Sequence, residues 1–493
     1  MRRLFSIIAS SLLLTVAFSS CQEKLKPEDP VVDGEIYYIN FFAFNAMNTY
    51  YLWVDEVQDA MNAWERNADP VESVYNVRYK DRDGVDIDRW TQMITDYDAF
   101  TSSVGGVETT YGFDFQLYYF DQSKDMVCAV VTLVYAGSPA ENAGLHRGDV
   151  IMSVNGKTMT EGNYRAVVTD ELFGGSRVSL GLQRGETLDL EAVKMYEDPV
   201  LVTKVFNCPG GKKVGYLAYT SFTIKSAREL VQVCLDFRKA GVSELILDLR
   251  YNSGGYVITE NVLASMLAPE EEVLAGSVFE KEIYNAALTK ELGSGVNKFK
   301  TNFRFTADGE GYDFTTLGAN IGLSKIYAII DSGTASASES LLTGLMPYMD
   351  VVLIGGQSHG KYCGGIMYSA KEWYQDNRKY MDEDVYEAGI KQAGKWGIYV
   401  IYERYADKDG VTPCMPDGFV PDISVEDTPL EARELGDPRE TMLAVALEQA
   451  GYVAPSSSTT LSAGSPAAAL PRAVRIADAP KKAAFGVRLE LPR

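Results

Sequence analysis

The chain has 493 residues, with 46 Lys and Arg against 68 Asp and Glu, so its formal net charge is −22. This charge argues against a nucleic-acid-binding protein, which needs a basic face to displace counterions from phosphates. Hydrophobic residues make up 46% and charged residues 23%, which excludes both a wholly disordered chain and a membrane-spanning bundle. Only two histidines are present, so a His-rich metal site is not expected, and a serine/histidine pair would have to use His146 or His359.

Residues 1–20 have the layout of a secretory signal, in which Arg2 and Arg3 precede an apolar run and two small residues. The Cys21 that follows resembles the lipidated first residue of a bacterial lipoprotein. We therefore expect a signal peptide over 1–20 and a lipidated polar tether over 21–38; simple cleavage and an uncleaved anchor are the alternatives. The expected location is the cell envelope, on the outer membrane facing the periplasm or the cell surface.

The remaining five cysteines contain no C-x-x-C pair, which disfavours a zinc ribbon or a thioredoxin-type site. In an oxidising compartment Cys363 and Cys414 are the candidate disulfide, and buried free thiols are the alternative.

Residues 39–105 are predicted to form a small helical domain. Apolar residues recur at helical spacing from Ile39 to Ala63, and a further helix is expected around 88–97. The aspartates at 81–88 do not fit the spacing of an EF-hand, so we interpret this segment as a solvated acidic loop.

Residues 106–200 show short alternating strands, at 128–134, 150–154 and 178–182. The string G-S-P-A-E-N-A-G-L-H-R-G-D-V-I-M-S-V-N-G-K, from Gly137 to Lys157, resembles the helix, turn and strand of PDZ domains. Upstream, the residues Tyr111, Gly112 and Phe113 resemble the PDZ loop whose amides hold a peptide's terminal carboxylate. The resemblance implies peptide binding by strand addition, and the alternative is a PDZ fold that serves only as a spacer.

Residues 201–452 alternate strands and helices, which predicts a largely parallel sheet with crossover helices. The expected strands are 214–217, 245–249, 326–330 and 351–354, and the expected helices are 226–240 and 335–346. The predicted fold is thus a multidomain chain, α/β and α+β, with a helical N-terminal domain, a β-rich PDZ-like domain and a mixed α/β core.

Residues 453–493, with six basic and two acidic residues, are predicted to be a flexible tail. The alternative is that this tail docks on the acidic body or on the chain's own PDZ groove.

The strongest candidate for chemistry lies after the strand 326–330, in D-S-G-T-A-S-A-S-E at residues 331–339. Small residues there let the chain turn sharply and present a hydroxyl at a helix N-terminus, where unpaired amides favour developing negative charge. A serine cluster can equally be a plain N-cap. A base for Ser336 is available in Lys361, because an amine that is desolvated enough to be neutral can accept a proton.

The pair T-A-S-A-S-E and G-K, whose Ser336 and Lys361 are 25 residues apart, resembles the serine/lysine dyad of the C-terminal processing peptidases, or tail-specific proteases. The resemblance implies that Ser336 is the nucleophile and Lys361 the general base. It also implies an oxyanion hole from the Ala337 amide and a glycine amide of D-L-R-Y-N-S-G-G, with Gly254 preferred and Gly255 possible. No metal and no organic cofactor are required by this chemistry.

The order of the domains, and G-F-V-P-D at 418–422, are also similar to this family. Two features depart from it: Gly365 stands where some members have a supporting Gln, and Pro347 where others have an acid. The residue that orients the lysine is therefore open between three candidates. They are Asp350, Ser358 and His359.

Three other functions compete with the peptidase. Gly355 to Lys361 reads G-x-x-x-x-G-K after a strand, but Tyr362 replaces the Ser or Thr of a phosphate-binding loop, which disfavours an NTPase. A Ser336/His359 pair is chemically reasonable. The rival of another class is a catalytically weak or inactive peptide-binding lipoprotein. The favoured hypothesis is an envelope serine endopeptidase whose partners are protein or peptide substrates with exposed C-terminal ends, held at the membrane by its lipid.

Overall fold

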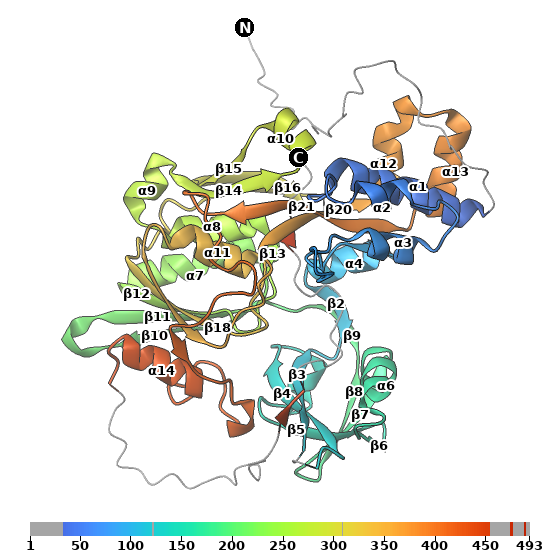
Figure 1. The fold of residues 1–493 in the computed structure, drawn as a ribbon. Helices are drawn as coiled ribbons and strands as arrows, with labels where there is room; N and C mark the ends of the chain where they lie inside the picture. The colour runs from blue at the N-terminus through green and yellow to red at the C-terminus, as the bar shows by residue number, and fades with distance from the viewer. Residues whose placement is uncertain (1–32, 121–122, 308, 454–473, 477–487, 490–493) are drawn as a thin grey trace.

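The computed structural model describes residues 33–120, 123–307, 309–453, 474–476 and 488–489 (Figure 1). The predicted signal peptide, Cys21 and most of the tether lie outside the described residues. None of the helices in the described part of the chain is long and apolar enough to cross a lipid bilayer.

A six-stranded sheet forms the centre of the larger lobe, in the order β10-β11-β12-β18-β19-β22. All its neighbouring strands are parallel except β10 and β11. Its strands are β10 (Val200–Asn207), β11 (Lys213–Tyr219), β12 (Glu244–Asp248), β18 (Lys325–Ile330), β19 (Asp350–Gly355) and β22 (Ile423–Ser424). The predicted mixed α/β fold is therefore confirmed, and the four expected strands of this region correspond to β11, β12, β18 and β19.

Helices cover both faces of this sheet. Leu230 of α7 and Leu341 of α11 join the largest hydrophobic cluster on one face, whereas Met442 and Leu443 of α14 pack on the other. The helices of this lobe are α7 (Ser226–Ala240), α8 (Val257–Leu267), α9 (Glu270–Ala275), α10 (Ala286–Leu292), α11 (Ala337–Leu345) and α14 (Thr441–Gln449). A separate hairpin joins β16 (Asn302–Ala307) to β17 (Glu310–Thr315). Since αβ crossovers bring the ends of parallel strands to one edge, this arrangement places the 331–336 and 355–361 loops side by side.

A second sheet has the order β13-β24-β20-β21-β14-β15, with β1 also paired to β21. Its strands are β1 (Gln92–Ile94), β13 (Gly255–Tyr256), β14 (Val278–Tyr284), β15 (Gly295–Lys298), β20 (Cys363–Ser369), β21 (Gly397–Ala406) and β24 (Arg488–Leu489). The predicted helix around 88–97 is wrong for all but its last residue, because residues 92–94 pair antiparallel with β21 and helix α4 begins only at Tyr97. Burial of Met93 and Ile94 against this sheet outweighs the local helical pattern.

The N-terminal helices pack together with two later helices, as Figure 1 shows. They are α1 (Gly34–Tyr50), α2 (Gln58–Asn62) and α3 (Pro70–Val77), and the later pair is α12 (Ala370–Asn377) and α13 (Glu383–Ala393). The fourth N-terminal helix, α4 (Tyr97–Val104), instead contributes Val104 to the largest hydrophobic cluster. Phe41 of α1 lies edge-on to Trp373 of α12, 5.8 Å between ring centroids. Residues 33–77 therefore share one hydrophobic core with residues more than 300 positions away.

The smaller lobe is a sheet in the order β23-β3-β4-β5-β7-β8, with β6 on β5 and a separate β2–β9 ribbon leading to the larger lobe. Its strands are β2 (Val107–Thr110), β3 (Phe113–Tyr119), β4 (Val127–Val134), β5 (Val150–Val154), β6 (Lys157–Thr158), β7 (Arg177–Leu182), β8 (Thr187–Glu191), β9 (Val193–Tyr196) and β23 (Val474–Arg475). Two short helices, α5 (Pro139–Asn142) and α6 (Tyr164–Ala166), complete this lobe. Helix α6 continues as a π-helix over Val167–Phe173.

The described cysteines are all free thiols and all are buried. The candidate disulfide between Cys363 and Cys414 is therefore not formed, and the alternative of buried free thiols holds. Burial raises the pKa of the Cys414 thiol. Both side chains pack in the main hydrophobic cluster.

Candidate active site

Ser336 lies in a strained turn between β18 and α11. It is the N-cap residue of α11, with φ 61° and ψ −117°, a conformation that costs a non-glycine residue about 1–3 kcal/mol. Its side chain is 0% exposed, and its Oγ makes no well-formed hydrogen bond within the described part of the chain. Thr334 holds the turn, since its Oγ1 donates to Leu249 O over 2.8 Å and accepts from Asp331 N over 3.0 Å. Ser336 is thus the N-cap residue of α11 in a capping box with Glu339, so the N-cap alternative also fits this turn.

The carboxylate of Glu339 connects this turn to the loop after β19. Its Oε2 accepts hydrogen bonds from Ser336 N (3.1 Å) and Lys361 N (2.8 Å). Its Oε1 accepts from Ser358 Oγ (2.5 Å) and Gly360 N (2.7 Å). Burial raises the pKa of Glu339, and the four hydrogen bonds oppose that rise. The structure thus brings the backbones of Ser336 and Lys361 onto a single carboxylate oxygen.

The Lys361 side chain is 0% exposed and lies among aromatic rings. Its Nζ donates to Tyr399 OH over 2.9 Å and lies 5.6 Å from the centre of the Trp90 ring. Tyr405 OH donates to Lys361 O over 2.7 Å and so fixes the backbone at this position. Withdrawal from water is the condition under which a lysine can lose its charge and act as a base.

The candidates for orienting the lysine lie in different places. Ser358 belongs to the Glu339 cluster, and its Oγ also accepts from Phe419 N over 2.7 Å. His359 donates its backbone N–H to Thr334 O over 2.9 Å, and its ring lies 6.2 Å from that of Trp90. Asp350 is exposed and begins β19, at the opposite end of the strand from the lysine loop.

The departure at Gly365 has a structural counterpart. A Cβ atom at this position would lie 2.6 Å from Cζ of the Tyr399 ring. Any larger residue there, including glutamine, would displace the tyrosine that contacts Lys361 Nζ. Tyr399 therefore occupies the space in which a supporting Gln would start.

The glycine turn after β12 is tied directly to the Ser336 turn. Asn252 O accepts hydrogen bonds from Ala335 N (3.1 Å) and Ser338 Oγ (3.0 Å). The Gly254 amide donates to Asn252 Oδ1 over 2.9 Å, so in this structure it is engaged within its own turn. Gly255 has φ 141° and no room for a Cβ, which would lie 2.6 Å from Phe222 O. The turn therefore depends on glycine at 255, and the fully buried Ala337 opens α11 beside Ser336.

A buried charge network around Asp248 and Arg250 anchors the glycine turn. The guanidinium of Arg250 bonds Asp248 (2.8 Å), Glu440 (2.7 Å) and Asp427 (3.1 Å). Arg147 of the smaller lobe joins it through Asp427 at 2.6 Å. Nearby arginines lower the pKa of Asp427 against the opposing effect of its burial. The two lobes are therefore joined at the base of the glycine turn.

The predicted carboxylate-binding loop begins β3. Gly112 has φ 81° and its N–H donates to Thr110 Oγ1 over 3.0 Å, while Tyr111 OH donates to Gly175 O over 2.7 Å. Phe113 is buried and pairs with Val134 of β4. The loop thus stands at one end of the sheet edge formed by β3.

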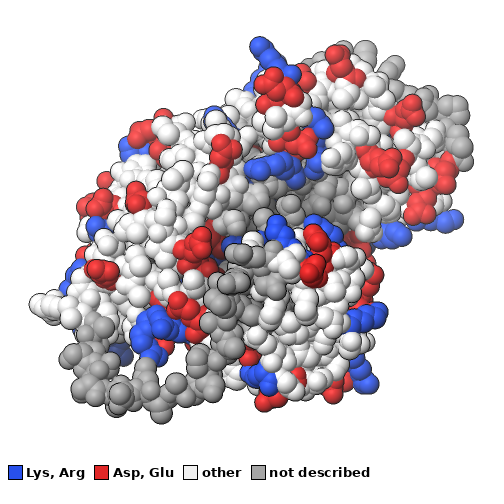
Figure 2. Space-filling model, turned by 60° about the horizontal axis from the view of Figure 1, so that its bottom comes forward, with Lys and Arg blue, Asp and Glu red and all other residues white. Residues whose placement is uncertain are grey.

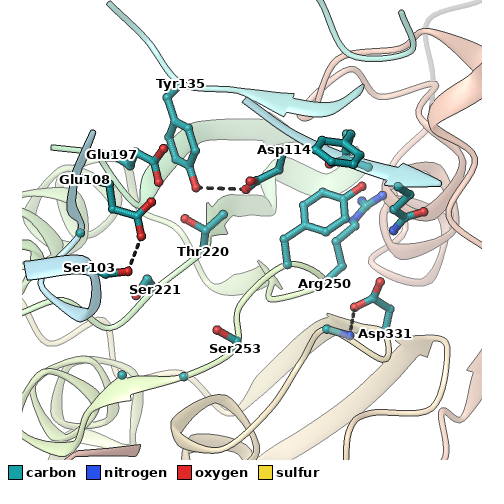
Figure 3. Close-up of a pocket in the computed structure, with 18 of the residues that line it drawn as sticks. Ser103, Glu108, Asp114, Tyr135, Glu197, Thr220, Ser221, Arg250, Ser253 and Asp331 are labelled. Carbon is teal, nitrogen blue, oxygen red and sulfur yellow. Dashed lines mark hydrogen bonds between the residues drawn. The ribbon is translucent and has the colours of Figure 1, made fainter. Parts of the chain in front are cut away.

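A cavity of about 310 Å³ joins this edge to the glycine turn. Figure 3 shows Asp114 and Tyr135 on the side of the smaller lobe and Arg250, Ser253 and Asp331 on the side of the core. Other lining residues include Phe115, Phe173, Gly254, Gly255, Gly333 and Arg475. On the face in Figure 2, acidic and basic side chains are interspersed, so the net negative charge does not gather there into one patch. The cavity extends from the PDZ-like edge to the glycine turn and to Asp331 and Gly333, at the start of the loop that leads to Ser336.

The comparisons with known proteins agree with this arrangement. Residues 213–425 match the family model of Peptidase family S41, and residues 130–171 match that of the PDZ domain. The chain is 25% identical over 235 residues to the carboxyl-terminal-processing protease of a Picosynechococcus species, covering 47% of this chain and 50% of that protein. It is 26% identical over 253 residues to the carboxy-terminal processing protease CtpA of Bacillus subtilis, covering 51% and 47%. The matches thus span about half the length of these two relatives.

A solved structure supports the fold. A Bacteroides fragilis protein assigned to the S41 proteases aligns with a TM-score of 0.58 at 23% identity, covering 83% of this chain and 96% of that one. The chain therefore has one segment that matches the PDZ domain model and one that matches the model of Peptidase family S41, on a fold similar to that of the Bacteroides fragilis protein.

Three residues at the site have no role in the sequence-based hypothesis. Glu339 stands three positions after Ser336, the S-x-x-E spacing of a capping box, which could have identified it. Tyr399 and Trp90 reach Lys361 only through the second sheet, from 38 and 271 positions away, and no local pattern points to them.

Proposed function

We propose that this protein is a serine endopeptidase of the cell envelope, which captures C-terminal ends of protein substrates through its PDZ domain and cleaves them with a Ser336/Lys361 dyad. One observation carries the proposal. Glu339 Oε2 accepts the amides of both residues, while the hydroxyl of one and the amine of the other are withdrawn from solvent.

The chemistry follows from these positions. Ser336 Oγ attacks the substrate carbonyl while its proton passes to the neutral Lys361 amine, and the resulting ammonium protonates the leaving amine. Water then attacks the acyl-enzyme and passes a proton to Lys361. When the Ser336–acyl bond breaks, Lys361 gives this proton to Ser336 Oγ, so the hydroxyl and the neutral amine are restored and the new carboxylic acid is released.

The oxyanion is stabilised by the Ala337 amide and by a glycine amide of the 252–255 turn. The Gly254 amide can serve only if it leaves Asn252 Oδ1, and Gly255 is the second candidate. Two aligned amide donors are worth about 3–4 kcal/mol or more to the transition state.

Substrate capture is proposed at β3 and at the loop of Tyr111, Gly112 and Phe113. A peptide added antiparallel to β3 would place its terminal carboxylate at this loop. The cavity lined by Phe115, Phe173 and Gly254 then gives the chain a route towards the catalytic turn.

The envelope location is proposed from the sequence of residues 1–21 alone. Metabolic labelling with a radioactive fatty acid tests it, with Cys21→Ala as the control. Label on the wild type and none on the variant is expected, whereas equal labelling would contradict lipidation at this residue.

A second candidate function is a peptide-binding lipoprotein without turnover. It is favoured by the engagement of the Gly254 amide with Asn252 and by the complete burial of Ser336. Protein that begins at residue 22 should be incubated with unfolded casein, alongside Ser336→Ala, Lys361→Ala and His359→Ala. We expect cleavage by the wild type and by His359→Ala only. Equal, negligible cleavage by all four would support the binding module, and loss in His359→Ala with retention in Lys361→Ala would replace the lysine as base.

A further inference from the structure

Part of the C-terminal tail forms a strand on the PDZ-like sheet. Val474 pairs with Tyr119 and Arg475 with Tyr118, antiparallel, so β23 lies against β3. The next residue, Ile476, donates its backbone N–H to Leu117 O over 2.9 Å. The segment therefore runs along β3 towards the Tyr111–Phe113 loop, in the direction in which a captured peptide end would run.

The side chain of Ile476 anchors this strand. It is only 8% exposed and belongs to the hydrophobic cluster of the PDZ-like lobe, together with Leu117 and Phe113. Val474, two residues earlier, is 42% exposed. Burying an isoleucine side chain contributes about 1.5–3 kcal/mol to the free energy of docking. The hydrophobic contact of this strand therefore depends on Ile476 and not on the basic residues of the tail.

Arg475, the residue before Ile476, lies on the side of the cavity between the two lobes. Arg475 lines the cavity between the lobes together with Asp331 and Gly333, and its charge lowers the pKa of Asp331 against the larger effect of burial. A cation of the tail is thus placed beside the turn that carries Ser336.

The tail also enters the second sheet. The backbone of β24 pairs parallel with β13, Gly255 with Arg488, and parallel with β20, Gly365 with Leu489. β24 lies between the two strands that follow the glycine turn and Lys361. The described tail residues therefore pair with strands of the body, as the docking alternative predicted, and are not a flexible segment.

We infer that the chain's own tail is the resident peptide of both sites: β23 with Ile476 fills the PDZ edge, β24 fills the gap between β13 and β20, and together they exclude other peptides until displaced. The inference rests on the proposed function in one respect, that the edge of β3 is where substrate peptides bind. The occupant is an extended segment with one apolar anchor and a flanking arginine. A peptide of the same chemistry competes with it.

The test uses the full chain after residue 21 with Ser336→Ala, so that nothing is cleaved. The probe is a fluorescein-labelled synthetic peptide with the sequence of residues 470–493, and its binding is measured by fluorescence anisotropy. With Ile476→Asp added, the tail is released and the probe should bind about 10-fold more tightly or better, because the site is no longer filled from within. Val474→Asp makes the same chemical change at an exposed side chain and should leave the affinity within about 2-fold, as surface substitutions do.

Equal probe affinity in the Ile476→Asp and Val474→Asp proteins would overturn the inference. A second measurement covers a variant that misfolds: hydrogen exchange of residues 113–119 should be faster in a chain ending at Tyr452 than in the full chain, and unchanged exchange would also overturn it. The two proposals fail separately. Tighter binding by the Ile476→Asp protein without casein cleavage by the chain that ends at Tyr452 and keeps Ser336 retains the tail site and rejects the peptidase. Cleavage by that chain, with equal probe affinities in the Ile476→Asp and Val474→Asp proteins, retains the peptidase and rejects the tail site.

Discussion

The backbone amides of Ser336 and Lys361 donate to the same atom, Glu339 Oε2, over 3.1 Å and 2.8 Å. The two residues come from different crossover units, on the loops after β18 and β19. A buried carboxylate that accepts four hydrogen bonds fixes both loops at once, and none of those bonds occupies the hydroxyl or the amine that would react. Glu339 is thus a positioning residue for the proposed dyad.

Glu339→Gln should lower kcat by about 10–100-fold, because the new NH₂ group opposes buried N–H donors and each lost acceptor costs about 1–3 kcal/mol. The measurement is kcat and KM on a fluorogenic peptide, with circular dichroism to check the fold. KM should change less than kcat, since the carboxylate contacts no part of the proposed peptide path.

The matched control is Glu372→Gln, which alters the capping box of α12 at Ser369 in the same way, away from the dyad. It should cost some stability and leave kcat within about 2-fold, as a lost cap does. Equal kcat values for the two variants would show that Glu339 does no more than cap its helix.

Tyr399→Phe should lower kcat by about 5–10-fold, because removing one hydrogen bond of about 1–1.5 kcal/mol frees the Lys361 amine to leave its position. KM should stay the same, which separates this effect from damage to peptide binding. Stopped-flow or steady-state assays on the same fluorogenic peptide measure both constants.

Tyr374→Phe is the comparison for this change. Its hydroxyl also makes one hydrogen bond, 2.8 Å to Tyr38 O, in the other hydrophobic core. It should alter the melting temperature and not kcat. If Tyr399→Phe retains full kcat, Tyr399 has no part in orienting the lysine.

The parallel sheet could be predicted from the sequence because its strands are short apolar runs bounded by clear turns, and α7 was placed at Ser226–Ala240 as found. Likewise, Ser336 and Lys361 stand in local strings that identify them. The second sheet could not be predicted, since β20 and β21 are paired antiparallel across 27 residues of helix and loop, and β1 joins from 300 positions away.

The contacts that complete the site have the same non-local origin. Tyr399 reaches Lys361 from β21, and the space it fills depends on Gly365 lacking a side chain. A glycine in a strand signals a close approach in general, but does not say which residue approaches. Ile476 is similar: the apolar residues of the Ala-, Ser- and Pro-rich tail follow no helix or strand period that singles it out, and only the edge of β3 gives it a partner.

Arg147→Leu should destabilise the protein by about 3 kcal/mol, the low end for a broken buried ion pair, because Arg250 still neutralises part of the Asp427 charge. The Arg147 side chain is 1% exposed and joins the smaller lobe to the core. Differential scanning calorimetry should show a lower melting temperature and separation of the two lobes into distinct transitions.

Arg184→Ala provides the control in the same lobe. Arg184 pairs with Asp149 and Glu186, but its side chain is 36% exposed, and such surface pairs contribute about 0–1 kcal/mol. A loss of stability as large in Arg184→Ala as in Arg147→Leu would mean that the interlobe network has no special role.

Asp331 should make stability depend on pH near neutrality. Burial raises its pKa to about 7 from 3.8, the nearby charge of Asp427 adds to this, and Arg475, Arg250 and the Gly333 amide oppose it. The folded protein therefore holds a proton on Asp331 that the unfolded chain has released, and stability falls as pH rises from about 4 to about 7. At about 1.4 kcal/mol per unit the full cost is on the order of 4 kcal/mol above pH 7.

Asp331→Asn should remove this dependence, because an amide still accepts from Gly333 N and carries no charge at any pH. Melting temperatures measured from pH 4 to pH 8 should show the variant gaining on the wild type up to about pH 7 and holding a constant lead above it. Asp350→Asn, at an exposed carboxylate paired with Lys325, should give a difference that does not vary in this way. Arg475→Ala removes the tail cation that favours the charged form, so it should extend the fall in stability to higher pH. A constant gap between wild type and Asp331→Asn across the whole range would show that Asp331 is charged throughout, and no effect of Arg475→Ala would show that the tail does not reach it.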